Sequence, residues 1–387
     1  MPIFATTRDN VMYSKLFKEH DYKVDWKFVE SIPEFAALKN CEQNPKWHGE
    51  GNAWIHTKKC VEAAYDLVLE PRYEALNPRI AIAAVLFHDI GKGVTTEFVK
   101  GAWHAYGHEF AGEKIARRLL WDEVLSIREI ICACARYHMK VLNLASSKRI
   151  VDDMIKMSKI AFTHFRYLLF VKECDVLGSR PMDEGQTTAD LERLGAIYKI
   201  ANRLDILDRE FFVPEIDNDI IFNPSKPINW YGLGKNVPTV RMLIGLPGAG
   251  KNTWCEDRHD MVMLSRDDIR AELGYCKEGE KVVLSGEKED RVTEVFNSRF
   301  INAVKEGKDV ILNNLNIKKK YRDALKVVVN GYSVRWVYIY IEAPSIEDNI
   351  KRRPTFDPDQ LRGMTEVLEW PQPDEYDEMF YVKGMQS

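Results

Sequence analysis

Residues 240–254 read VRMLIGLPGAGKNTW, and this stretch decides the fold of the second half of the chain. An apolar run typical of a buried β-strand leads into the pattern Gly245-x-x-x-x-Gly250-Lys251, and the residues that follow favour a helix. Glycines at these positions let backbone N–H groups turn inward around phosphate oxygens, and the helix N-terminus adds the positive end of its dipole. The stretch therefore predicts a phosphate-binding loop at the carboxyl end of a strand.

One position of this loop departs from the usual pattern. Asn252 stands where Ser or Thr normally ligates Mg²⁺, and Thr253 follows it. The amide oxygen of Asn252 could still coordinate Mg²⁺, so ATP binding is a firmer expectation than the geometry of the ion. Lys251 is expected to reach the β- and γ-phosphates. The residues of the loop expected to bind the nucleotide are Gly245, Gly248, Ala249, Gly250, Lys251, Asn252 and Thr253.

Sequence texture divides the chain into two kinds of structure. From Thr239 on, short β-rich runs alternate with helix-like segments, which is typical of an α/β domain with a parallel sheet. The four β-rich runs are Val240–Leu246, Met261–Leu264, Val310–Leu312 and Val334–Ile341. From Trp54 to about Asp175 the pattern is helical and no strand alternation interrupts it. Its clearest helical runs are Ile80–Phe87, Ile127–Ala135 and Phe165–Glu173.

These patterns predict a multidomain chain. We expect an all-α domain over residues 1–180, a connector over 181–238 that contains a helical stretch at Leu191–Leu207, and an α/β domain over 239–387. A length of 387 residues is too great for one ordinary core, which supports two domains.

Composition limits the classes of function. The net charge of −4 argues against a protein that coats nucleic acid non-specifically, because such binding needs a broad excess of Lys and Arg. No run approaches the roughly 18 apolar residues of a membrane span, and the charged residues near the start interrupt any signal-peptide core. The seven scattered cysteines favour a reducing, cytoplasmic setting. The number of subunits stays open.

A pair of aspartates follows the second predicted strand. Ser265-Arg266-Asp267-Asp268-Ile269-Arg270 comes directly after VMLS, so its carboxylates are expected at the carboxyl edge of the sheet beside the phosphate loop. Together with the loop, this segment resembles the phage polynucleotide kinase family. The resemblance implies that Asp267 is the general base for a 5′-hydroxyl and that Arg270 holds the acceptor's phosphate. The alternative is that the two aspartates only cap a helix.

Two further segments resemble parts of the same kinases. DVILNNLN, residues 309–316, resembles the family's third strand, but Asn313 and Asn314 stand where an acidic residue is usual. Lys351-Arg352-Arg353 follows the fourth strand and a short helix, where related kinases carry an arginine lid. The resemblance therefore implies that Arg352 and Arg353 also bind the triphosphate. Cations at the C-terminal end of a helix would equally offset its dipole.

Histidines concentrate in the helical half. Six of the nine fall between positions 48 and 138, and neutral imidazoles together with carboxylates are the ligands that a borderline divalent metal prefers. The candidate ligands are His56, His88, Asp89, His108, His138 and Asp175. Lys92 lies one helical turn after Asp89.

The surrounding segments NPKWHGEGNAWIHT, LFHDIGKG, HAYGHEFAG, YH and CD resemble the HD phosphohydrolase superfamily, most of all the HD domain attached to bacterial tRNA nucleotidyltransferases. The resemblance covers roughly residues 44 to 180. It implies one metal site of His56, His88, Asp89 and Asp175, and a second metal on His108 and His138 bridged by Asp89. One metal or two stays open. Asp89 and Lys92 are the expected catalytic residues, with Lys92 stabilising phosphoryl charge, and Ni²⁺, Co²⁺, Mn²⁺ or Zn²⁺ is the expected metal.

The two halves together resemble the bifunctional enzymes that pair an HD domain with a polynucleotide kinase and heal broken RNA or DNA ends. The expected activities are ATP-dependent phosphorylation of 5′-hydroxyls and removal of 2′,3′-cyclic, 2′- or 3′-phosphate, with a polynucleotide ligase as partner. The kinase resemblance suggests a phage protein of the host cytoplasm.

Two alternatives stay open. A small-molecule kinase fused to an HD nucleotide phosphohydrolase is the main rival, and a regulatory nucleotide switch is a third. The basic run Lys318-Lys319-Lys320-x-Arg322 favours a polynucleotide if it tracks a phosphate backbone, and the alternative is that it is the solvated start of a helix.

Overall fold

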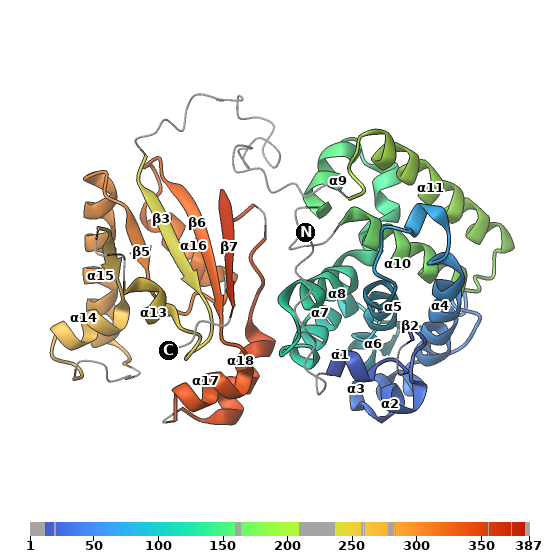
Figure 1. Ribbon diagram of the computed structural model, residues 1–387, viewed down its shortest axis with the longest axis horizontal. Helices are drawn as coiled ribbons and strands as arrows, with labels where there is room; N and C mark the ends of the chain where they lie inside the picture. Colours follow the sequence, from blue (N-terminus) through green and yellow to red (C-terminus); the bar gives the residue numbers. More distant parts are fainter. Residues whose placement is uncertain are drawn as a thin grey trace. The chain divides into compact units, whose positions relative to one another are not determined.

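The computed structural model describes residues 12–18, 21–158, 164–208, 237–256, 258, 260–277, 282, 284–354, 356–372 and 374–383. These residues form two compact units, a helical unit before residue 213 and an α/β unit after it (Figure 1). No helix in the described ranges combines the length and the apolar character that a bilayer crossing requires.

The helical unit is built around four helices that pack on one another: α4, α5, α8 and α10. Its helices are α1 (Met12–Lys15), α2 (Trp26–Ser31), α3 (Pro33–Ala36), α4 (Ala53–Leu67), α5 (Pro78–Phe87), α6 (Lys92–Thr95), α7 (His108–Leu119), α8 (Leu125–Tyr137), α9 (Ile150–Ser158), α10 (Phe165–Gly178) and α11 (Glu184–Arg203). Residues Ile80–Phe87 of α5 are all buried, so this helix forms the centre of the core. Pro78 in the first turn and the side chain of Asn77, which accepts from the backbone N–H of Ile80, fix where α5 begins.

The expectation of an uninterrupted helical pattern is wrong at residues 97–104. Strands β1 (Glu97–Val99) and β2 (Ala102–His104) form an antiparallel hairpin. Its two-residue turn is Lys100-Gly101, and both residues have positive φ, as the tightest hairpin turns require. Three-residue strands are too short to show alternation in the sequence, which is why the pattern missed them.

Helix α11 lies inside the range predicted as a connector. Its residues Leu194, Ile197 and Ala201 are buried in the same core as the other helices of the unit. The described part of the range before residue 209 therefore packs with the helical unit. Residues 209–236 lie outside the described residues, and the division into 1–180, 181–238 and 239–387 stays a prediction.

The α/β unit contains a five-stranded sheet in the order β4-β5-β3-β6-β7, in which every neighbouring pair is parallel, as predicted. The strands are β3 (Thr239–Ile244), β4 (Val262–Leu264), β5 (Val310–Leu312), β6 (Arg335–Glu342) and β7 (Glu378–Lys383). The helices are α13 (Lys251–Cys255), α14 (Arg266–Glu272), α15 (Glu287–Lys305), α16 (Lys319–Val328), α17 (Ile346–Arg352) and α18 (Pro358–Val367).

The order of the strands places the predicted kinase residues at one edge of the sheet. Strand β5 lies between β3 and β4, and all three run in the same direction. The segments that follow these strands therefore leave the sheet side by side, which is where α/β folds bind ligands. Strand β7 was not predicted, and it pairs with β6 at the far edge of the sheet.

Candidate metal centre and phosphate loop

The six predicted metal ligands come from five separate parts of the helical unit and are all buried. His56 lies on α4, His88 and Asp89 at the end of α5, His108 at the start of α7, His138 just after α8, and Asp175 on α10. Packing of these helices brings together residues that are up to 119 positions apart.

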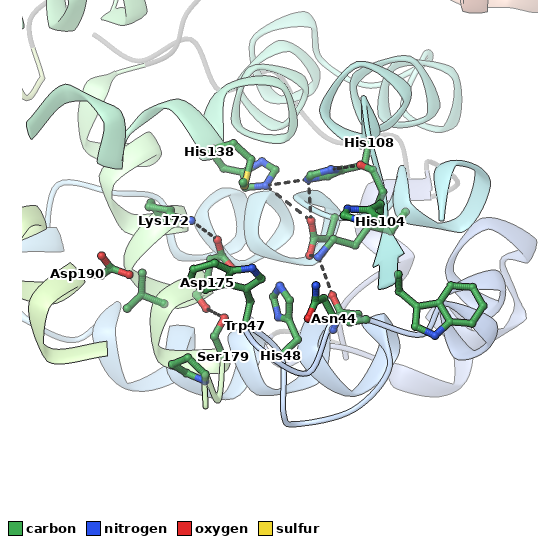
Figure 2. Close-up of a pocket in the computed structure, with 18 of the residues that line it drawn as sticks. Asn44, Trp47, His48, His104, His108, His138, Lys172, Asp175, Ser179 and Asp190 are labelled. Atoms are coloured by element: carbon green, nitrogen blue, oxygen red, sulfur yellow. Dashed lines mark hydrogen bonds and ion pairs between the residues drawn. The ribbon is translucent and has the colours of Figure 1, made fainter. Parts of the chain in front are cut away.

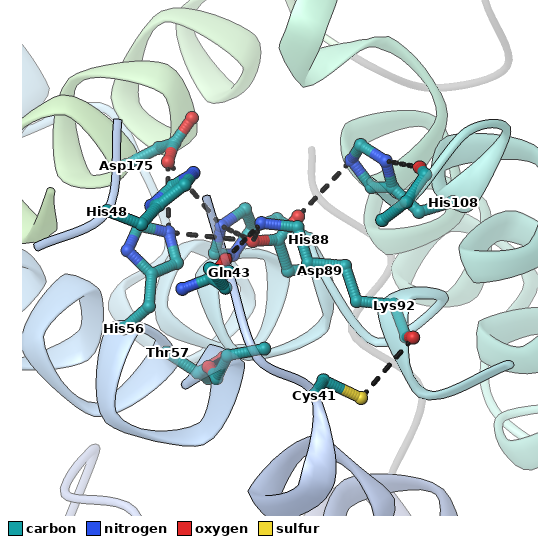
Figure 3. Close-up of polar contacts among 12 residues, drawn as sticks. Cys41, Gln43, His48, His56, Thr57, His88, Asp89, Lys92, His108 and Asp175 are labelled. Carbon is teal, nitrogen blue, oxygen red and sulfur yellow. Dashed lines mark hydrogen bonds and ion pairs between the residues drawn. The ribbon is translucent and has the colours of Figure 1, made fainter. Parts of the chain in front are cut away.

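One group of ligand atoms surrounds the Oδ2 side of Asp89 (Figure 3). Nε2 of His56 lies 3.1 Å from Oδ1 of Asp175 and 3.5 Å from Oδ2 of Asp89. Nε2 of His88 lies 3.3 Å from Oδ2 of Asp89 and 3.8 Å from Oδ1 of Asp175. The four residues predicted to form one metal site therefore point their ligand atoms at a common point.

A second group faces the other oxygen of Asp89. Oδ1 of this carboxylate lies 3.3 Å from Nε2 of His108 and 3.7 Å from Nε2 of His138. The two Nε2 atoms are 3.4 Å apart. Asp89 thus stands between two sets of imidazoles, which is the arrangement that a bridging carboxylate needs.

The chemistry of these residues fits a divalent metal. The Nδ1 atoms of His88, His108 and His138 each donate a hydrogen bond of 2.9 Å or less to a backbone carbonyl oxygen. The lone pair of each Nε2 is therefore directed into the cluster. Nε2 of His88 is buried and has no hydrogen-bond partner among the described residues. A buried nitrogen without a partner is costly unless something else binds it. A metal ion would satisfy it.

Charge acts differently on the members of the cluster. Although burial alone would lower both, Cys60 and Asp175 raise the pKa of His56, and Asp89 raises the pKa of His108. Burial alone would raise the pKa of Asp89, but Lys92 and the imidazoles of His88 and His108 hold it well below its usual range. Burial lowers the pKa of His138 well below its usual value, which keeps this imidazole neutral as a ligand must be. Nζ of Lys92 donates hydrogen bonds to Oδ2 of Asp89 at 2.6 Å and to Oε1 of Gln43 at 2.7 Å.

The sequence analysis missed two charged residues of the centre. Oε1 of Glu50 lies 2.7 Å from Nδ1 of His56 and 2.8 Å from Nδ1 of His48, so it orients both rings. Nζ of Lys172 lies 2.6 Å from Oδ2 of Asp175. Signals for both were present, because Glu50 sits inside the quoted segment NPKWHGEGNAWIHT and Lys172 is one helical turn before Asp175.

Close backbone contact explains the glycine of the segment LFHDIGKG. A Cβ atom on Gly91 would lie 2.0 Å from the carbonyl oxygen of His108 and 2.5 Å from the backbone nitrogen of Gly112. Only glycine lets the chain after α5 approach α7 so closely. The close packing of the two segments places Nε2 of His108 beside Oδ1 of Asp89.

A cavity of about 430 Å³ opens over the metal ligands. Asp89, His108, His138 and Asp175 form part of its wall together with Lys92 and Lys172 (Figure 2). The cavity therefore gives a substrate access to the ligand cluster and to two lysines that can contact a phosphate.

In the α/β unit, the phosphate loop has the predicted form. Gly250 has φ of 101° and directly precedes α13, which begins at Lys251. Gly248 has φ of 75°, and a Cβ atom there would lie 2.7 Å from the carbonyl oxygen of Asn349. Nζ of Lys251 donates to the carbonyl oxygens of Gly245 and Leu246, each at 2.9 Å, and so bridges the loop.

The end of α17 lies against this loop, as the arginine-lid comparison implied. Nη1 of Arg352 donates a hydrogen bond of 3.3 Å to the carbonyl oxygen of Gly248. Nδ2 of Asn349 donates one of 2.8 Å to the carbonyl oxygen of Pro247. Arg353 also approaches Gly248. The two arginines therefore border the place where phosphates are expected.

Asp267 and Arg270 form an ion pair in the first turns of α14. Nη1 of Arg270 lies 2.8 Å from Oδ1 of Asp267, and its Nη2 lies 2.9 Å from Oε1 of Glu289 on α15. The alternative that the aspartates cap this helix is wrong, because the capping side chain is that of Ser265. The carboxylate of Asp267 is instead engaged by Arg270.

The idea that the whole basic run 318–322 follows a nucleic-acid backbone is also wrong. Arg322 is fully buried, and its guanidinium pairs with the carboxylate of Glu375 at 2.7 and 3.1 Å. Lys319 pairs with Asp323 at 2.9 Å. Arg322 therefore stabilises the interior of the α/β unit through its buried ion pair and cannot reach a phosphate.

Comparisons with known proteins agree with this division. Residues 53–206 match the family model of the HD domain, and residues 240–370 match an AAA domain model, AAA_33. The chain therefore combines an HD domain with a P-loop kinase-like domain, which confirms the predicted fold class. Its first half is all but entirely helical, and its second half is an α/β domain around a parallel sheet.

Curated relatives and solved structures each match part of the chain. The Multifunctional CCA protein of Actinobacillus pleuropneumoniae serotype 5b (strain L20) is 38% identical over 88 residues, which are 23% of this chain and 20% of that protein. The Multifunctional CCA protein of Pasteurella multocida (strain Pm70) is 31% identical over 112 residues, 28% of this chain and 26% of that protein. The chain thus spans about a quarter or less of the length of these relatives. They are homologues of its HD part, as the sequence resemblance implied.

Two solved structures are similar at low identity. A chain of the Pnkp1/Rnl/Hen1 RNA repair complex has 19% identity and a TM-score of 0.29, with 35% of this chain and 45% of that chain covered. A gluconokinase from Sinorhizobium meliloti 1021 has 18% identity and a TM-score of 0.28, with 40% and 86% covered. Likenesses at this level say nothing about the reaction.

Proposed function

We propose that this protein heals broken nucleic-acid ends: it phosphorylates 5′-hydroxyls with ATP and removes 2′,3′-cyclic, 2′- or 3′-phosphate at the other side of the break. The observation that carries the proposal is the Asp267–Arg270 ion pair of 2.8 Å, which lies after β4 at the carboxyl edge of the sheet that also carries the phosphate loop. A base and an acceptor-binding cation side by side are what phosphoryl transfer to a hydroxyl requires.

In the proposed kinase reaction, Asp267 accepts the proton of the acceptor's 5′-hydroxyl. The oxygen of that hydroxyl attacks the γ-phosphorus of ATP, and ADP leaves. Arg270 exchanges part of its contact with Asp267 and Glu289 for the phosphate of the acceptor. Lys251 leaves the carbonyl oxygens of Gly245 and Leu246 and turns to the transferring phosphoryl group. Magnesium bound with ATP supplies further neutralisation of phosphate charge.

In the proposed hydrolase reaction, the ligands are His56, His88, Asp89, His108, His138 and Asp175. A divalent metal on them supplies an acidified water and polarises the phosphate. Lys92 and Lys172 each hold one of the two carboxylates at 2.6 Å, and both line the cavity. We assign to them the neutralisation of charge that develops on the phosphoryl oxygens.

A second candidate is a small-molecule kinase joined to an HD nucleotide phosphohydrolase. The burial of Arg322 favours it, because it removes one cation from the run that was expected to follow a polynucleotide. The net charge of −4 points in the same direction. We prefer end healing because Arg270 gives the kinase site a cation suited to an acceptor that already carries a phosphate.

We further propose that the protein works in a reducing cytoplasm, on ends that a polynucleotide ligase then joins. A ligase needs a 5′-phosphate and an unblocked 3′-hydroxyl, and these are the two products of the proposed reactions. All seven cysteines are free, and six of them are buried, which suits that setting.

The test uses γ-labelled ATP with a 5′-hydroxyl oligonucleotide and, separately, with a panel of nucleosides and sugars. Label on the oligonucleotide supports end healing, and label only on a small molecule supports the second candidate. Hydrolysis of ATP, or its binding, without any labelled acceptor would instead indicate a nucleotide switch. A parallel assay measures phosphate release from 2′,3′-cyclic and 3′-phosphate ends.

A further inference from the structure

The cavity over the metal ligands extends well beyond the groups that a phosphate would touch. Besides the ligands and lysines, its lining includes Trp47 and Trp103 and a polar set from α11: Gln186, Thr187 and Asp190. A volume of about 430 Å³ exceeds what a phosphate group alone occupies and falls in the range of sites for small organic ligands. The part of the cavity away from the metal ligands therefore has room for the group that carries the phosphate.

Trp47 is held beside the metal centre and yet remains open to solvent. The backbone N–H groups of Trp47 and His48 both donate to the carbonyl oxygen of Asn44 at 3.0 Å, which fixes this turn. The ring of His48 meets that of the metal ligand His56 at 4.8 Å between centroids. Trp47, one residue earlier, is 47% exposed, which is unusual for so large an apolar side chain. Figure 2 shows it at the same cavity as His48 and Asp175.

Two further segments of the cavity lining, β2 and α11, add aromatic and polar groups. Trp103 lies on β2 of the hairpin, where Phe98 packs against it edge to face at 5.1 Å and supports the ring. On α11, Nε2 of Gln186 donates 2.8 Å to Oδ2 of Asp190, so this wall offers fixed polar groups. The partly exposed ring of Trp47 also has Nζ of Lys46 at 4.7 Å from its centroid. Such a ring together with amide and carboxylate groups matches the two parts of a nucleoside, its flat base and its hydroxyl-bearing sugar.

We propose that this outer part of the cavity is a nucleoside subsite, in which Trp47 stacks on the base of the nucleotide that bears the scissile phosphate. The proposal rests on the proposed hydrolase function and deepens it, because it makes the terminal nucleotide, and not the phosphate alone, the recognised unit. Trp47 is a specificity-determining residue in this view. Every base has a π-face, so the stack distinguishes nucleotides from other phosphate esters without selecting a sequence.

The test compares two oligonucleotides that end in a 3′-phosphate and differ only in whether the last nucleotide has its base or is abasic. With the full chain loaded with Mn²⁺, Trp47→Ala should raise KM for the intact end by about tenfold, within the range typical of one base stack. The abasic end should bind wild type and variant equally weakly. Trp47→Phe should have a KM for the intact end that is close to the wild-type value. Tyr332→Ala, an exposed aromatic of the other unit, is the matched control and should behave as wild type.

A binding measurement separates this proposal from the proposed function. Calorimetry with adenosine 3′-monophosphate and with ribose 5-phosphate, without turnover, reports the subsite even if neither oligonucleotide is hydrolysed. Base-dependent binding that is lost in Trp47→Ala, without hydrolysis, would keep the subsite and overturn the hydrolase. Equal binding of both ligands to wild type, or equal loss of both in Trp47→Ala, would overturn the subsite.

Discussion

The side-chain nitrogen of Asn313 donates a hydrogen bond of 3.1 Å to Oδ1 of Asn252. Asn252 is the departure from the usual pattern in the phosphate loop, and Asn313 is one of the two amides after β5 where an acidic residue was expected. The amide oxygen that could reach Mg²⁺ is thus already engaged by the second amide. The pair carries no charge, so neither residue contributes a carboxylate to the shell of the ion.

Asn252→Ser should keep or raise kinase turnover, because it returns the hydroxyl that other phosphate loops present to Mg²⁺. The measurement is kcat for 5′-phosphorylation over a Mg²⁺ titration, with Asn330→Ser, an exposed amide after α16, as control. A loss of more than about tenfold, about 1.4 kcal/mol of barrier, would mean that the Asn252–Asn313 bond itself is required.

The two activities should be separable, because their residues lie in different units. Lys251→Ala or Asp267→Ala should lower 5′-phosphorylation by about 10²- to 10⁴-fold and leave phosphate release unchanged. His88→Ala or Asp89→Ala should do the reverse. Both activities are measured on all four variants after each is shown to be folded. A composite site would be indicated if Asp89→Ala lowered the kinase as strongly as the hydrolase.

Metal-stripped protein should regain hydrolase activity with Ni²⁺, Co²⁺, Mn²⁺ or Zn²⁺ but not with Mg²⁺ alone, because four imidazoles favour a borderline metal over a hard one. Phosphate release after dialysis against a chelator, followed by addition of each ion, gives the answer. The kinase in the same samples should respond to Mg²⁺. Full hydrolase activity with Mg²⁺ alone would contradict the prediction.

Gly91→Ala should destabilise the helical unit by about 1–3 kcal/mol and reduce its metal content, because the new methyl group collides with the backbone of α7. Thermal unfolding and metal analysis of the purified protein measure both effects. Gly195→Ala is the matched control: nothing lies within 4 Å of the added atom on α11, so stability should hold or rise. Unchanged metal content in Gly91→Ala would show that α7 can shift without moving His108.

Arg322→Ala should cost about 3–5 kcal/mol of unfolding free energy, because it leaves the carboxylate of Glu375 buried without its partner. The double variant Arg322→Met/Glu375→Leu should recover most of that loss. Denaturant unfolding of the three proteins tests this. Oligonucleotide affinity of the double variant should match wild type, and a weaker affinity with a smaller salt dependence would return Arg322 to the binding surface.

Local patterns were enough to predict the phosphate loop, the parallel sheet and the helical first half. Each depends on neighbours in the chain: a strand that runs directly into Gly250-Lys251, short β-rich runs that alternate with helix-like segments, and an apolar helical run that ends at His88-Asp89. The clustering of histidines with aspartates also predicted a metal centre, and the resemblance to HD domains gave the candidate ligands. These signals are local, because the hydrogen bonds of a helix or turn join residues close in the chain, and the period of the apolar residues follows from the element that they form.

Only the tertiary structure decided which charged groups meet. Glu50 orients His56, and Lys172 contacts Asp175. Arg322 pairs with Glu375, which lies 53 positions further along the chain. Helix α11, which lies inside the range predicted as a connector, contributes Asp190 to the lining of the cavity over the candidate metal ligands. The physical reason is that a charged side chain shows in the sequence neither its burial nor its partner. The sequence determined the two kinds of domain, and the packing of distant helices decided which residues surround the candidate ligands and the shape of the cavity above them.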